Sequence, residues 1–134
     1  MNWRSVGAVI GGFAVTATLS IATDGILHVM SVFPPMGVRM SDPLFVLAAT
    51  YRALFTVAGG YTTARLAPRT PMRHATALAI VGTLTGALGI VVWAKGGDSM
   101  GPLWYTLSIP LSAFPCIGAG AWLARRTMAS SSRA

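Results

Sequence analysis

The sequence predicts an all-α integral membrane protein of four antiparallel transmembrane helices, with short loops and with both termini in the cytoplasm. Three observations lead to this fold class: the composition, four long apolar segments, and the uneven placement of arginine. Of the 134 residues, 54% are hydrophobic and 10% are charged, whereas soluble domains carry about 25% charged residues. A soluble fold of this length could not bury so much apolar surface, so the composition indicates that lipid is the solvent.

The four apolar segments cover about residues 6–30, 44–66, 75–94 and 103–123. Each is near or above the roughly 20 residues that a helix needs to cross a hydrocarbon core of about 30 Å. The breaks between them contain Pro and Gly, which favour turns: Pro34, Pro35 and Gly37, then Pro68 and Pro71, then Gly96, Gly97 and Pro102. Because the breaks are short, we expect consecutive helices to be antiparallel neighbours. Residues 1–134 should form one transmembrane domain that ends in a disordered tail, 129–134.

Basic residues concentrate on one side of the predicted bundle. They precede the first segment, lie around the second break and follow the fourth segment: Arg4, Arg65, Arg69, Arg73, Arg125, Arg126 and Arg133. On the other side, Arg39 and Lys95 are offset by Asp42 and Asp98. The positive-inside rule therefore places the termini and the second break in the cytoplasm. We expect a multi-pass protein of the cell membrane, and the Arg- and Ala-rich composition favours a bacterial inner membrane.

The second break carries a compact basic patch, which we define as Arg65, Arg69, Arg73 and His74. Such a patch is typical of a topology signal that contacts anionic lipid head groups. An alternative is a docking site for an acidic partner. The net charge of +7 would suggest nucleic acid for a soluble protein, but here the charges lie beside apolar segments. We therefore expect the lipid bilayer, and no nucleic acid, as the partner.

Each predicted helix has a face of small or hydroxyl-bearing residues, which is typical of helix contacts in membranes. These faces are Gly12, Thr16, Ser20, Asp24 and His28; Arg52, Thr56, Gly59, Gly60 and Thr63; Ala75, Ala79, Gly82, Gly86 and Gly89; and Ser108, Ser112, Cys116 and Gly120. We expect them to pack together in a compact bundle. Alternatively, one of them could be the seam of a homo-oligomer or of a larger membrane complex.

Three ionisable residues lie well inside the apolar segments: Asp24, His28 and Arg52. Charges at that depth are costly and often mark functional sites. Asp24 precedes Pro34 by ten residues and Arg52 follows Asp42 by ten, so both should lie about 15 Å below the outer loop at 1.5 Å per residue. We therefore predict a buried Asp24–Arg52 ion pair. The predicted intramembrane polar site consists of Asp24, His28, Arg52, Ser20, Thr56 and Ser112.

Two functions fit these observations. The first is a structural, accessory or assembly protein of the membrane, in which the ion pair fixes helix register. The second is a small oligomeric transporter or channel, in which the polar site handles a proton or substrate. No nucleophile–base pair stands out, so we do not expect an enzyme. The lone Cys116 excludes an intramolecular disulfide, and we expect no cofactor and no metal.

Overall fold

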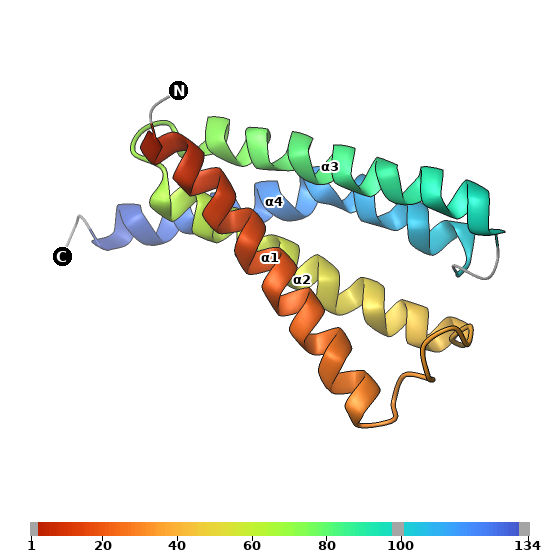
Figure 1. Ribbon diagram of the computed structural model, residues 1–134. Helices are drawn as coiled ribbons and strands as arrows, with labels where there is room; N and C mark the ends of the chain where they lie inside the picture. The colour runs from red at the N-terminus through yellow and green to blue at the C-terminus, as the bar shows by residue number, and fades with distance from the viewer. Residues whose placement is uncertain (1–2, 98–100, 132–134) are drawn as a thin grey trace.

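The computed structural model describes residues 3–97 and 101–131 (Figure 1). The chain forms α1 (Trp3–Val29), α2 (Asp42–Leu66), α3 (Pro71–Gly96) and α4 (Leu103–Ser131). Each helix is long and apolar enough to cross a membrane, and no strand occurs in the described ranges. The prediction of an all-helical chain with four candidate membrane spans is therefore confirmed. Asp98 and Arg133, two of the charges from which the orientation is predicted, lie outside the described residues.

The helix boundaries follow from proline and from left-handed backbone. Proline lies in the first turn of both α2 and α3, where its missing N–H costs nothing. As a result α3 begins at Pro71, four residues before the predicted start. The end of α1 is followed by Ser31 with a φ of 57°, a conformation that a helix cannot continue through. The next turn-forming residues, Pro34 and Pro35, lie in the connection to α2.

The end of α4 corrects one prediction. Residues 129–131, expected to begin a disordered tail, continue the helix to Ser131. No Gly or Pro follows Gly120 in the sequence, and the Ser130 and Ser131 hydroxyls donate to the Thr127 carbonyl at 2.9 and 3.0 Å. The chain therefore contains no signal that would stop the helix earlier. The rest of the predicted tail, 132–134, lies outside the described residues.

Helix α2 is central to the packing and contacts each of the other three helices. Figure 1 shows α3 and α4 side by side along most of their length, whereas α1 crosses α2 and its later turns diverge from α3. The bundle is therefore closed where α1 begins and open where α1 ends. This difference positions the candidate site.

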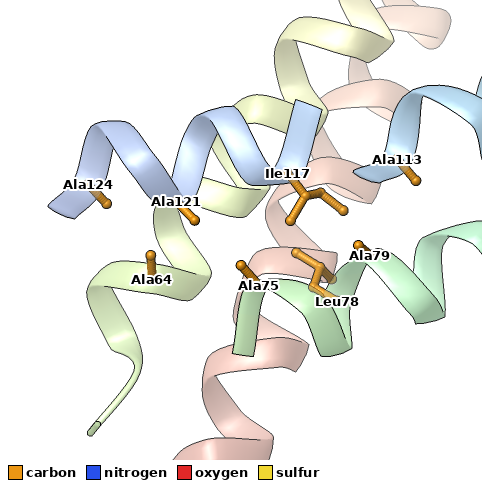
Figure 2. Packing of buried hydrophobic residues seen from close by; sticks show 8 residues of the cluster. All are labelled: Ala64, Ala75, Leu78, Ala79, Ala113, Ile117, Ala121 and Ala124. Atoms are coloured by element: carbon orange, nitrogen blue, oxygen red, sulfur yellow. The ribbon is translucent and has the colours of Figure 1, made fainter. Parts of the chain in front are cut away.

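The closed end has a core made mostly of alanine (Figure 2). Its buried members come from α2, α3 and α4: Ala64, Ala75, Leu78, Ala79, Ala113, Ile117, Ala121 and Ala124. Side chains this small let backbones touch. A Cβ added to Gly60 would lie 2.7 Å from the Ile117 Cα, and one added to Gly12 would lie 2.5 Å from the Gly59 carbonyl oxygen. Close backbone approach is how helices without long apolar side chains pack in membranes.

The buried face of α4 differs from the predicted one. Of the predicted residues only Gly120 lies on it, and the other members are Thr106, Pro110, Ala113, Ile117, Ala121 and Ala124. Ser108 and Ser112 satisfy their hydroxyls within the helix, through the Tyr105 and Ile109 carbonyls at 2.6 and 3.1 Å. These serines therefore need no partner on another helix. Alanine is smaller than serine and lets the neighbouring helices approach more closely, so alanine lies on the buried face. Pro110 fits against Gly86 of α3, where an added Cβ would lie 3.0 Å from the proline ring.

Candidate functional site

The candidate site centres on the Asp24 carboxylate of α1. A terminal nitrogen of Arg52, on α2, donates a hydrogen bond to one carboxylate oxygen, so the predicted ion pair is present. The Tyr51 hydroxyl donates to the other oxygen. The Asp24 and Arg52 side chains are 29% and 33% exposed, so the pair is half-buried and not buried as predicted. The carboxylate therefore joins α1 to α2 through two donors, at the rim of the bundle.

Sequence reasoning missed Tyr51. The predicted face of α2 begins at Arg52 and follows spacings of mainly three and four residues, which place the neighbour of Arg52 on a different side of the helix. A usable signal was present, since a tyrosine hydroxyl inside an apolar segment needs a hydrogen-bond partner when it is buried. Asp24 was the only acidic residue within the predicted segments, so it was the natural acceptor.

His28 lies one turn beyond Asp24 but does not reach its carboxylate. The Nδ1 of His28 lies 2.8 Å from the Asp24 backbone carbonyl oxygen. The imidazole meets the ring of Phe33 edge to face, with centroids 5.4 Å apart. His28 is therefore near the ion pair, but it is held by the end of its own helix and by the following loop.

The loop between α1 and α2 folds over the ion pair. Phe33 is buried against Ala48 and Tyr51 of α2, and its backbone N–H donates to the Leu27 carbonyl at 3.0 Å. Beside it lies a cavity of about 260 Å³, which we call the vestibule. Its walls are loop residues 33–40, parts of α2 and the polar side chains of Asp24, His28, Arg52 and Tyr105.

A second cavity, of about 350 Å³, lies on the other side of Arg52. We call it the groove; α1, α2, α3 and α4 all contribute to it. Three predicted site residues line it: Ser20, Arg52 and Thr56. Ser112 does not: its hydroxyl donates to the Ile109 carbonyl within α4, so the structure does not bring it together with the other predicted site residues.

Arg52 is the residue that the vestibule and the groove share. It is also the only charged residue among the described residues that line the groove. Its Nε is buried and has no hydrogen-bond partner within the described chain. A guanidinium carries five N–H donors in one plane, so Arg52 can hold Asp24 and still donate to a further acceptor.

The residues of the predicted basic patch lie around the connection of α2 to α3. Arg65 is in the last turn of α2, Arg69 lies in the connection, and Arg73 and His74 belong to the first turn of α3. The three arginines are exposed. Arg65 also lines an open cleft with Arg4 from the start of α1, which extends the basic surface onto a second helix.

No group of three or more His, Cys, Asp or Glu side chains suited to a metal ion lies within ranges 3–97 and 101–131. Within the site, Asp24 and His28 are two residue types that can bind metals. However, the Nδ1 of His28 already lies within hydrogen-bond distance of the Asp24 backbone carbonyl oxygen. Comparison of the chain with protein families, with curated proteins and with solved structures finds no match.

Proposed function

We propose that the protein is a structural or accessory protein of the membrane, in which Asp24, Tyr51 and Arg52 form a clamp between α1 and α2. One observation carries the proposal: two adjacent residues of α2 both donate to the single carboxylate of α1. An ion pair of this kind fixes which turns of two helices face each other, even where it adds little net stability. We include no catalytic activity in this role.

The proposed setting is a cell membrane, with a bacterial inner membrane favoured by the composition. The four helices would cross it as antiparallel neighbours, with both termini and the basic patch in the cytoplasm. The placement of Arg4, Arg65, Arg69 and Arg73 supports this orientation, because arginine is enriched in short cytoplasmic loops. The same residues suit contact with anionic lipid head groups.

Single-cysteine labelling tests the orientation. In a Cys116→Ser background, Met36→Cys lies in the exposed first loop and Pro68→Cys in the exposed second connection. A membrane-impermeant maleimide added to intact cells should label the first and not the second. Labelling of Pro68→Cys without lysis would reverse the proposed topology.

The accessory role is tested by the size of the assembly and by a charge swap. In mildly solubilised native membranes the protein should migrate within a larger complex rather than alone. Asp24→Arg and Arg52→Asp should each lower thermal stability, and the double variant should recover part of the loss. A double variant no more stable than either single one would contradict the clamp.

A small oligomeric transporter is the second candidate, and one observation favours it. Arg52 lines both the vestibule and the groove, so rearrangement of the ion pair could connect them. The test is proton or solute flux in proteoliposomes. If the wild-type protein shows a specific flux, and the folded Asp24→Asn and Arg52→Gln variants both lose it, the ion pair acts as a gate and not as a clamp. If the wild-type protein shows no flux, the accessory role is supported.

A further inference from the structure

The groove has the shape and lining of a binding site for an apolar chain. It exists because the later turns of α1 diverge from α3 (Figure 1). Most of its walls are apolar or small, including Phe13, Ile21 and Leu78 and the glycines Gly82, Gly86 and Gly89. Its volume of about 350 Å³ is at the lower end of the roughly 300–1,000 Å³ found for small-molecule sites. That space suits one alkyl chain rather than two.

The groove also has one polar end. Arg52 lines it and is the only charged residue among the described residues that do so. A guanidinium carries five N–H donors in one plane, and one terminal nitrogen of Arg52 donates to Asp24. An acceptor oxygen on a molecule in the groove would take a hydrogen bond from a guanidinium N–H that faces the groove.

The charge balance selects the kind of acceptor. Asp24 already neutralises Arg52, so the pair has no net charge. A carboxylate or phosphate head would add an unbalanced charge and would lose its hydration, which is costly in an apolar setting. An ester carbonyl or a hydroxyl accepts a hydrogen bond without that cost.

We propose that the groove binds a single-chain amphiphile from the bilayer with an uncharged, hydrogen-bond-accepting head. The head accepts a hydrogen bond from Arg52, and the chain lies between α1, α3 and α4. The inference rests on the proposed membrane setting and on the Asp24–Arg52 ion pair, but not on the structural role proposed for that pair. Binding is measured on purified full-length protein in detergent, so its failure is distinct from a failure of the topology or of the charge swap.

The direct test uses three probes with the same dodecyl chain: a glycerol monoester, the carboxylate and the trimethylammonium cation. Saturable binding followed by native mass spectrometry should favour the ester by about tenfold, which corresponds to about 1.4 kcal/mol. No saturable binding, equal binding of all three probes, or preference for either ion would overturn the proposal.

Two matched glycine substitutions separate the groove from general effects on the helices. A Cβ added to Gly89, which lines the groove, or to Gly118, which does not, meets no atom within 4 Å. Gly89→Leu should fill the groove and weaken ester binding about tenfold or more, whereas Gly118→Leu should leave binding unchanged. An equal loss in both variants would contradict the site.

Asp24→Asn tests the effect of charge balance on the head group, because it keeps the side-chain shape but leaves the positive charge of Arg52 without a counter-charge. To the folded Asp24→Asn variant, the carboxylate probe should bind about tenfold more tightly than the ester. An unchanged order of preference would overturn the assigned head group. If this variant does not fold, the comparison of Gly89→Leu with Gly118→Leu decides the proposal.

Discussion

The two ends of the bundle hold their helices together by different means. At the closed end the contacts are between backbones, because the residues there are mainly alanine and glycine. At the open end the contact between α1 and α2 is made by the long side chains of Tyr51 and Arg52, which reach Asp24. Long polar side chains join helices at a distance, and the space between the helices becomes cavities. The difference explains why the closed end is a core and the open end is the candidate site.

The largest expected effect comes from adding one methyl group at the closed end. In Gly120→Ala the new Cβ would overlap the Val57 carbonyl oxygen and lie 2.7 Å from the Tyr61 nitrogen. Both atoms belong to the α2 backbone and cannot turn aside, so α2 and α4 must separate. We expect a loss of about 3 kcal/mol in the free energy of unfolding, the upper part of the usual cost of overpacking.

Gly118→Ala is the matched control, two residues away on the same helix. Its Cβ would meet nothing within 4 Å, so it should be neutral or stabilise by about 0.5–1 kcal/mol through helix propensity. Equilibrium unfolding in mixed micelles measures both variants. Equal effects at the two positions would mean that α2 and α4 do not touch at Gly120.

The next largest effect concerns the open end. Asp24→Ala removes the acceptor of both Tyr51 and Arg52. Removing one partner of a fully buried pair costs about 3–5 kcal/mol. Since both side chains are about one-third exposed, we expect about 2 kcal/mol. The same unfolding measurement tests this, and a loss below about 0.5 kcal/mol would show that the open end does not depend on the clamp.

The number and approximate positions of the helices could be predicted from the sequence, but their packing could be predicted only in part. Four long apolar segments require four helices whatever their contacts, so their number and approximate positions followed from composition. The buried face of α4 did not. Serine and cysteine stand out in an apolar sequence, whereas Ala113, Ala121 and Ala124 do not. Whether a hydroxyl is satisfied inside its own helix, as at Ser112, depends on rotamers that the sequence does not display.

The candidate site, like the packing, could be predicted only in part. Opposite charges inside apolar segments have few ways to be neutralised, so Asp24 and Arg52 could be paired from their positions alone. The groove could not be predicted, because it depends on the angle at which α1 crosses α2. That angle follows from backbone contacts such as Gly12 against Gly59, which fix one end of the pair and leave the other free to diverge.

Tyr51→Phe should have a smaller effect than Asp24→Ala, because the carboxylate keeps its bond to Arg52. Hydrogen bonds to charged groups contribute about 1.5–3 kcal/mol, but Asp24 is partly exposed and can exchange the lost donor for water. We expect a loss of about 1 kcal/mol in the free energy of unfolding. A loss as large as that of Asp24→Ala would make Tyr51, rather than Arg52, the main donor of the clamp.

The smallest expected effects have opposite signs at two threonines of the α1–α2 contact. Each hydroxyl lies over a glycine of the other helix: Thr63 over Gly12, and Thr16 over Gly59. The Thr16 hydroxyl is 3.2 Å from the Phe55 carbonyl oxygen of α2 and donates to it. The Thr63 side chain is 0% exposed, and its oxygen has no partner among the described residues.

Valine keeps the branched shape of threonine and replaces the hydroxyl with a methyl group. Thr16→Val should therefore lose about 1 kcal/mol, the usual net value of a hydrogen bond. Thr63→Val should gain up to about 1 kcal/mol, because a buried hydroxyl without a partner is unfavourable. Measuring the free energy of unfolding of both variants under the same conditions shows whether each substitution destabilises or stabilises the protein. If both destabilise equally, close packing against glycine controls this contact and hydrogen bonding does not. The part of the α1–α2 contact that these threonines form would then depend on shape alone, whereas the polar contribution to that contact would come from Asp24, Tyr51 and Arg52.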